Sequence, residues 1–228
     1  TIFISHASRG GGAAVIGGAV SFVECLFANN HLRNSSSSTT YGGGLYLEGG
    51  THRIEHSVFS ANGTVSSSLA NARGDGLHVG GATTVVTAFN NLFNGNMRDA
   101  VHVENGALEI DYATFVTHGR YGVRRLNGTL AVANSIFWQC ADPTNGTMTI
   151  NNCLVDVDPL FERGLNLSSD SPAIDAGGDT ATSVGLDQRG TTKDGAADSG
   201  TADLGYHFNR GAFSYADDLI RFDPLLAN

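Results

Sequence analysis

Two short segments of the chain repeat an aspartate and a histidine in the same order, and these residue types can act as acids, bases or ligands. GDGLHV is followed 24 residues later by RDAVHV, which pairs Asp75 with Asp99 and His78 with His102. Asp75 and Asp99 are candidates for the acid/base or nucleophile pair that cleaves a glycosidic bond. The repetition indicates either a site or an architectural repeat that carries these side chains along.

A second chemistry is open to the same residues. Asp75, Asp99 and Glu104 are also candidate Ca²⁺ ligands, beside which Arg98 or Arg124 would help to abstract a proton from a uronic acid. A separate candidate Ca²⁺ site is formed by four aspartates that lie among glycines nearer the C-terminus, namely Asp187, Asp194, Asp198 and Asp203. Aspartates in such surroundings also form Asx-turns, so the sequence leaves Ca²⁺ open as a cofactor.

The elements that must position these residues recur along the chain. Five apolar–Phe segments align, with anchors at Phe27, Phe59, Phe93, Phe115 and Phe137, an earlier member at Phe3 and a later one at Val155. A glycine-rich segment precedes each anchor, and its first apolar residue lies 14 positions before the anchor in four cases. Leu77 to Phe93 is two residues longer. This spacing predicts a repeat architecture.

An alternating segment lies within each unit, as in AVSFVE, THRIEH, ALEIDY, TLAVAN and TMTINN. A period of two with one apolar face predicts a strand that faces a core on one side. A unit of this size without a helix cannot bury its apolar face alone, so stacking must supply the core. The sequence therefore predicts an all-β fold, a parallel β-helix of about six to seven coils over residues 1–158, with strands of neighbouring coils ~4.8 Å apart.

Compact residues recur at two positions around the anchors, as expected at the corners of stacked coils. Two residues before the anchors lie Cys25, Ser57, Asn91, Ala113, Ser135 and Cys153; three residues after them lie Asn30, Asn62, Asn96, His118 and Cys140. All three cysteines belong to these ladders, so we expect free thiols rather than a disulfide framework.

The repeat motifs resemble those of a known class of surface protein. GGAA, GGGL, FANN, FSAN and FNGN are similar to the GGA[ILV] and FxxN motifs of polymorphic outer-membrane-protein-like proteins. Farther on, DPLF, SPAIDAG, DQRG and DLGYHF occur in the order seen in the closing segment of bacterial secreted right-handed β-helix proteins. The resemblance implies a right-handed helix and a secreted or cell-surface location. It implies no single activity, because the architecture carries both enzymes and adhesins.

Residues 159–228 depart from the coil period, with more Asp and Gly and many turn signals. We expect this segment to close the helix by covering the strand edges of its last coil, which would otherwise invite aggregation. The first residues read as the middle of a coil, as if the N-terminus were truncated there. An open edge at that point favours self-association.

Aligning the coils places polar residues in one outward-facing stripe. In successive coils, the residue that follows the first apolar position is Tyr46, His78, His102 and Arg124. Two or three residues before that apolar position lie Asp75, Asp99, Arg98 and Arg120. Insertions at 33–41 and 64–73 fall beside this stripe, and such clustering often marks a binding face. A walled polar groove suits an extended glycan. The candidate ligand-binding residues are Tyr46, His78, His102, Glu104, Arg120 and Tyr121.

The simpler interpretation of the stripe is a ladder of charges that keeps the outer face polar, each pair contributing about 0.2–1 kcal/mol. We favour it because the NTD, DD, GHG and RIK motifs of polygalacturonase-type enzymes do not occur in the coils; DD 217–218 lies in the tail. We therefore expect a structural or adhesive surface module that binds glycans or other copies of itself. The alternative is a polysaccharide lyase or glycoside hydrolase acting from the stripe.

Charge and hydropathy limit the other partners. The net charge of −9, with a single lysine and no basic stripe, argues against nucleic acid. No apolar run approaches the 18 residues of a transmembrane segment.

Overall fold

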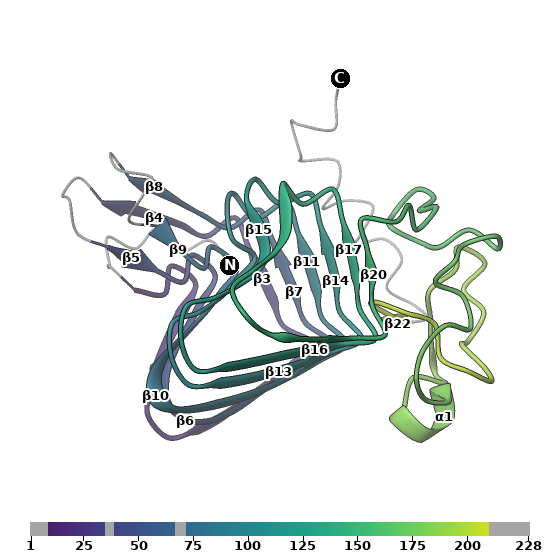
Figure 1. Ribbon diagram of the computed structural model, residues 1–228, viewed down its shortest axis with the longest axis horizontal. Coiled ribbons are helices and arrows are strands. Elements are labelled where there is room, and N and C mark those ends of the chain that lie inside the picture. Colours follow the sequence, from purple (N-terminus) through teal and green to yellow (C-terminus); the bar gives the residue numbers. More distant parts are fainter. Residues whose placement is uncertain (1–8, 35–38, 67–71, 210–228) are drawn as a thin grey trace.

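The fold, taken from a computed structural model, is nearly all β, with parallel sheets curled into a half-barrel (Figure 1). The structure describes residues 9–34, 39–66 and 72–209. One short helix, α1 (Ala181–Val184), lies outside the sheets; Thr180 caps its N-terminus and Gly185 ends it in the left-handed conformation.

The strands belong to successive repeats of the chain, each of which adds one or two strands to the ten-stranded sheet and one strand to the six-stranded sheet. Repeat 1 contains β1 (Ala13–Ile16), β2 (Ala19–Val23) and β3 (Leu26–Ala28); repeat 2 contains β6 (Leu45–Glu55) and β7 (Val58–Ser60). Repeat 3 contains β10 (Leu77–Phe89) and β11 (Leu92–Asn94); repeat 4 contains β12 (Val101–Val103), β13 (Ala107–Asp111) and β14 (Thr114–Val116). Repeat 5 contains β15 (Tyr121–Arg125), β16 (Thr129–Ala133) and β17 (Ile136–Trp138); repeat 6 contains β18 (Asp142–Asn145), β19 (Thr149–Asn151) and β20 (Leu154–Val155). Every pairing between repeats is parallel.

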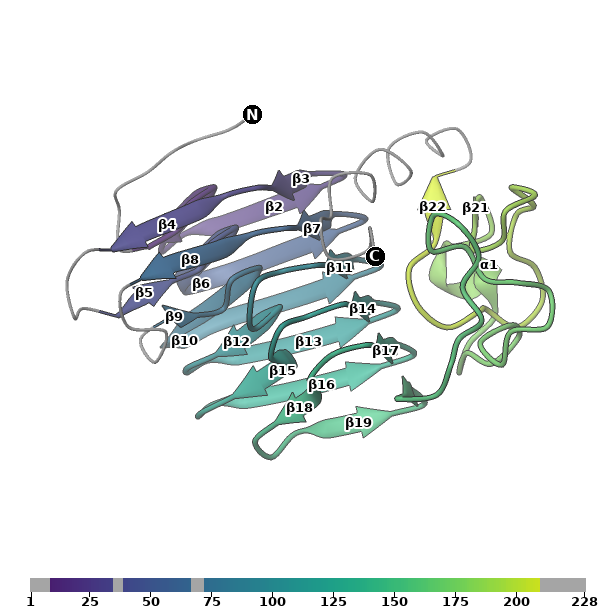
Figure 2. The ribbon, with the colours of Figure 1, turned by 90° about the horizontal axis from the view of Figure 1, so that it is seen from above.

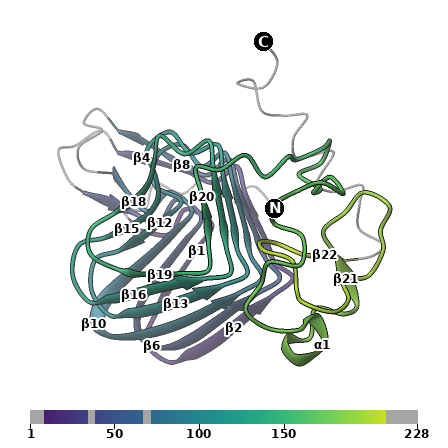
Figure 3. The same ribbon diagram turned by 45° about the vertical axis from the view of Figure 1, so that its right-hand side comes forward.

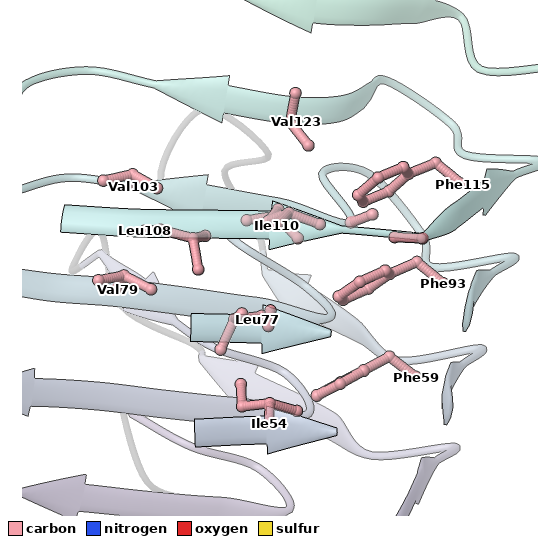
Figure 4. Packing of buried hydrophobic residues seen from close by; sticks show 14 of the residues in the cluster. Ile54, Phe59, Leu77, Val79, Phe93, Val103, Leu108, Ile110, Phe115 and Val123 are labelled. Atoms are coloured by element: carbon pink, nitrogen blue, oxygen red, sulfur yellow. The ribbon is translucent and has the colours of Figure 1, made fainter. Parts of the chain in front are cut away.

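The anchor residues form one column through the core, which confirms the repeat alignment. Phe27, Phe59, Phe93, Phe115, Phe137 and Val155 are successive partners in the six-stranded sheet β3–β7–β11–β14–β17–β20. Neighbouring Phe rings stack with centroids 4.6–4.9 Å apart. Aliphatic side chains of the larger sheet pack against the column (Figure 4). The predicted first anchor, Phe3, lies outside the described residues.

The longer spacing between Leu77 and Phe93 has a local cause. Strand β10 pairs in register with β6 up to Gly80, and the register shifts between Gly80 and Thr84. Four residues of β10 there match two of β6, so the extra pair is absorbed within one strand. Gly81 has φ +81°, a conformation that costs glycine little. Phe93 therefore pairs in register with Phe59, as the other anchors do with their neighbours.

Asparagines form the predicted ladder at the turn that follows each of the first three described anchors. The Nδ2 atom of Asn30 donates to Oδ1 of Asn62 at 2.9 Å, and Nδ2 of Asn62 donates to Oδ1 of Asn96 at 3.0 Å. The same amide of Asn62 also donates to the carbonyl oxygen of Phe27 at 2.8 Å. Buried polar groups of the turn are thus hydrogen-bonded.

The insertions in repeats 2 and 3 stack on each other at one side of the sheets. Strand β4 (His31–Asn34) pairs with β8 (Gly63–Ser66), and β5 (Thr40–Tyr41) pairs with β9 (Ala72–Arg73). We call these four strands the flap; they project to one side in Figures 1 and 3. The remainder of the inserted segments, 35–38 and 67–71, lies outside the described residues. As the sequence predicts, both insertions fall on one face.

The described part of the closing segment runs along the side of the repeats. Residues 159–209, including β21 (Arg189–Gly190) and β22 (Phe208–Asn209), lie beside the stack (Figure 2). Backbone N–H groups of Gly205, Tyr206 and His207 donate in turn to Asn134 O, Thr114 Oγ1 and Asn90 Oδ1. The segment thus crosses the repeats, because the polar groups along this corner offer it a line of partners. The tail 210–228 lies outside the described residues.

Candidate functional site

The stripe begins as a stack of rings on the outer side of three neighbouring strands. Tyr46, His78 and His102 are register partners in β6, β10 and β12. Each lies between two residues of the apolar core, so its side chain points away from that core. The Tyr46 and His78 rings lie 5.2 Å apart at 10°, and those of His78 and His102 lie 5.2 Å apart at 8°.

These side chains are buried, which corrects the expectation of a stripe open to solvent. Asp75, His78, Asp99 and His102 have 0% of their surface exposed, and Tyr46 has 4%. The flap explains part of this burial, because the Tyr41 ring packs edge-on against His78 at 4.7 Å. The insertions therefore cover the stripe in repeats 2 and 3 instead of walling an open groove.

Burial sets the ionisation of the two histidines. It lowers the pKa of His78 to about 4 because the charged ring would lose its hydration. It also lowers the pKa of His102, against the opposing effect of Asp99. Both imidazoles are therefore neutral at neutral pH, when each ring carries one N–H.

Glu104 links the ring stack to the flap. Its Oε1 accepts a hydrogen bond from Nη1 of Arg73 in β9 at 3.0 Å, and its Oε2 lies 3.5 Å from Nε2 of His78. Contact with His78, and then the charge of Arg73, holds the pKa of Glu104 below its usual value. The neighbouring repeat has a similar pair, because Arg9 contacts Glu48 at 3.0 Å.

Asp99 is one of the two fully buried aspartates of the stripe. Its Oδ2 lies 3.6 Å from Nδ1 of His102 and 3.9 Å from Nη1 of Arg124. Both separations exceed a normal hydrogen bond. Carboxylate, imidazole and guanidinium thus converge; the first two are buried and the side chain of Arg124 is partly exposed.

The stripe opens in repeat 5, beyond the flap. Tyr121, Arg120 and Arg124 are all partly exposed. The guanidinium of Arg120 lies 4.5 Å from the centroid of the Tyr121 ring and that of Arg124 lies 5.6 Å from it. Nη2 of Arg120 also donates to the Tyr121 hydroxyl at 3.3 Å. Arg98, predicted beside them, accepts the Arg120 backbone N–H at its carbonyl oxygen.

The four C-terminal aspartates, which the sequence left open as a Ca²⁺ site or as turn residues, do not form one cluster in the described structure. Across residues 9–34, 39–66 and 72–209, no group of three His, Cys, Asp or Glu side chains is placed to hold a metal ion. Asp194 instead forms an Asx-type turn, accepting the Ala196 N–H at 2.9 Å. Its exposed carboxylate has a lowered pKa because of that bond and one from Thr192. Asp187 is partly exposed.

Asp198 and Asp203 belong to a buried network that the sequence did not indicate. Nε2 of His207 lies 2.7 Å from Oδ2 of Asp198, and Nδ1 lies 3.0 Å from the carbonyl oxygen of Gly205. The side chain of His207 thus joins Asp198 to the backbone of the DLGYHF segment. Asp203 accepts the Asp175 N–H and the Thr191 hydroxyl, and burial raises its pKa. Asp203 and His207 belong to the DLGYHF motif, which is the sequence feature that could have indicated an ordered network in this segment.

The thiols are as expected. Cys25, Cys140 and Cys153 are free, and burial raises the pKa of Cys140 to about 12 and also raises that of Cys153.

Comparisons with protein-family models, with curated proteins and with solved structures return no match for this chain. In the part of the chain that the structure describes, no helix has the length and apolar character needed to cross a membrane.

Proposed function

We propose that the repeats form a right-handed parallel β-helix over residues 1–158, and that the chain is a structural and adhesive module of a secreted or cell-surface protein. Two features support the fold: parallel pairing from repeat to repeat, and one column of anchor residues, Phe in repeats 1–5 and Val155 in repeat 6. A stack of this kind is rigid and presents long, regular faces. The role that suits it is presentation of a polar face to a glycan or to another copy of the chain.

The observation that carries the non-catalytic role is the burial of Asp75, His78, Asp99 and His102. A general acid or base must come within about 3 Å of the proton it transfers. A polysaccharide cannot approach side chains that have no exposed surface and that Tyr41 and the neighbouring rings enclose. These residues therefore serve as a packed ladder, and binding falls to the exposed part of the stripe.

We also propose a closing role for residues 159–228. The described part binds the side of the stack through successive repeats, which supports a stabilising function for it. The strands of repeat 6 lie at the edges of their sheets in the described structure. That edge is a surface on which another copy could add a strand, which supports self-association as a second adhesive mode.

Binding is tested by electrophoresis of the whole chain through native gels that each contain one polysaccharide. The panel holds a uronic-acid polymer, a sulfated polymer and neutral dextran and galactan, with an unrelated acidic protein of similar size as reference. We expect retardation of the chain relative to the reference in at least one gel. Equal mobility in all gels would contradict a glycan-binding role.

A polysaccharide lyase or glycoside hydrolase is the second candidate function. The observation in its favour is the convergence of Asp99 with His102 and Arg124, at 3.6 and 3.9 Å. The same panel, assayed for new reducing ends and for absorbance of new double bonds with Ca²⁺ and with chelator, tests it. Turnover that is lost in Asp75→Asn or Asp99→Asn would establish catalysis and overturn the adhesive role.

A further inference from the structure

The stripe has a buried part and an open part. The stripe residues Tyr46, His78 and His102 of repeats 2–4 are buried, and the flap covers this face in repeats 2 and 3. The stripe residues of repeat 5, Arg120, Tyr121 and Arg124, are partly exposed. A ligand that approaches this face therefore has access to the repeat-5 residues.

The open part is cationic, in contrast to the chain as a whole. The protein has a net charge of −9, with 13 Lys and Arg against 22 Asp and Glu. Two guanidiniums, those of Arg120 and Arg124, nevertheless lie 4.5 and 5.6 Å from the centroid of the Tyr121 ring. A local positive charge on an acidic protein favours a negatively charged partner.

The arginines on this face differ in how closely a carboxylate contacts them. Beside the buried rings, the partly exposed side chains of Arg9 and Arg73 each contact a glutamate at 3.0 Å. In the open part, Arg124 lies 3.9 Å from a carboxylate, that of the buried Asp99, and the described contacts of the Arg120 guanidinium are with Tyr121. The charge of Arg120 and Arg124 is therefore less offset by close carboxylates.

The neighbouring residues limit the cationic site to Arg120, Tyr121 and Arg124. Arg125 is engaged elsewhere, because its guanidinium donates to the carbonyl oxygens of Gly128 and Thr147, both at 2.7 Å. Asp142 is the register partner of Tyr121 in repeat 6 and is exposed. It sets one border of the cationic surface, which runs from Arg120 across Tyr121 to Arg124.

We propose that Arg120, Tyr121 and Arg124 bind an anionic sugar unit of a glycan chain, through the carboxylate of a uronic acid or a sulfate group. This inference rests on the proposed glycan-binding function and specifies its ligand. A guanidinium presents a planar fork of donors that fits either oxyanion. The Tyr121 ring adds an apolar surface with a polar hydroxyl, which suits the mixed polarity of a sugar.

Titration of polymer into the whole chain, with the dissociation constant read from microscale thermophoresis, tests this assignment. The probes are polygalacturonate for the carboxylate, dextran sulfate for the sulfate and unmodified dextran as the neutral polymer, each at low and at 0.5 M salt. We expect saturable binding of one or both anionic polymers, with salt-dependent affinity. Arg120→Gln should weaken it about tenfold, equivalent to about 1.4 kcal/mol.

The matched control is Arg53→Gln, which removes one positive charge from an exposed arginine on β6. This variant should bind within about twofold of the unchanged chain, because it lies outside the site. Tyr121→Leu is the second test variant and should also weaken binding. Melting temperatures of all variants establish that each is folded, and neither Arg120 nor Tyr121 is part of the buried core.

The outcomes separate this inference from the function on which it rests. Retention of dextran that is unaffected by Arg120→Gln and Tyr121→Leu would overturn the anionic site and leave a glycan-binding module. Equal loss of affinity in Arg53→Gln and Arg120→Gln would also overturn it, since the attraction would then be one of overall charge. Failure to bind any glycan would contradict the proposed function itself.

Discussion

His207 and Asn90 hydrogen-bond to each other in both directions although 117 residues separate them. The backbone N–H of His207 donates to Oδ1 of Asn90 at 2.6 Å, and Nδ2 of Asn90 donates to the carbonyl oxygen of His207 at 3.0 Å. One amide side chain thus satisfies both backbone groups of a residue in the closing segment. Asn90 itself has φ +50°, a conformation that asparagine tolerates well.

The first prediction concerns this pair. Asn90→Gly keeps the positive φ and removes both hydrogen bonds, so we expect a loss of about 1–3 kcal/mol in the free energy of unfolding. Hydrogen exchange of residues 203–208 should accelerate at the same time. The control is Asn29→Gly, an exposed corner residue at φ +55°. Equal effects of the two variants would show that the closing segment does not depend on Asn90.

The second prediction concerns the Phe column. Phe93 lies between Phe59 and Phe115 and has no exposed surface, so Phe93→Ala should lower the free energy of unfolding by about 3–5 kcal/mol. Phe93→Leu preserves more of the volume and should cost less. Urea denaturation measures both. Similar midpoints for the unchanged chain and Phe93→Ala would contradict tight packing of the column.

The third prediction concerns acid. The pKa of His78 is lowered to about 4 in the folded chain, against about 6.5 when unfolded, so the unfolded chain binds the extra proton first. The resulting stability is fully present above about pH 6.5 and is lost as the pH falls towards 4, with a slope of about 1.4 kcal/mol per pH unit for one histidine.

His78→Phe keeps a ring in the stack and removes this titration. Urea unfolding at pH 7, 6, 5 and 4.5 should therefore show a shallower decline for the variant than for the unchanged chain. The remaining slope comes from other groups, including His118, whose pKa burial also lowers to about 4. Parallel curves for the two proteins would show that His78 is not buried as a neutral ring.

The fourth prediction concerns the thiols. Burial raises the pKa of Cys140 to about 12, and the thiolate is the reactive form, so this residue should resist thiol reagents at pH 8. In a chain that retains Cys140 alone, with Cys25 and Cys153 changed to Ser, labelling should be slow in buffer and complete within minutes in denaturant. Rapid labelling without denaturant would contradict the closed corner.

The sequence predicted the Phe column because parallel repeats place equivalent residues directly over one another. Spacing alone therefore identified Phe27 through Phe137, and even the two extra residues before Phe93 were visible. The cysteines and asparagines of the corners followed from the same alignment. Features that obey the repeat period are accessible to this kind of inference.

The burial of the stripe did not follow from the sequence, because its cover comes from outside the period. Tyr41 lies at the end of an insertion, and no spacing rule connects it with His78. The alternation of β10 and β12 indicates which way His78 and His102 point, and it gives no information on what lies beyond them. The expected groove was therefore a covered surface in repeats 2 and 3.

The path of the described closing segment along the repeats did not follow from the sequence, for a related reason. Its partners include backbone and side-chain groups at a corner where φ is positive, at Glu24, His56, Asn90, Tyr112 and Asn134. Only two of these five residues are asparagines, so residue type did not indicate the conformation. The sequence therefore did not indicate that this corner binds the closing segment.

The course of the closing segment has a mechanical consequence. A stack in which each repeat contacts only its neighbours can fray from either end. Here the segment reaches repeat 1 through the Arg189–Glu24 contact at 2.7 Å, repeat 3 through Asn90 and repeat 6 through the hydrogen bond from Asn152 to Ala176. The segment therefore connects both ends of the stack to its middle. Unfolding of an end repeat breaks its contact with the segment, and this also weakens the contacts of the segment with the middle repeats. Melting should consequently be all-or-none rather than stepwise.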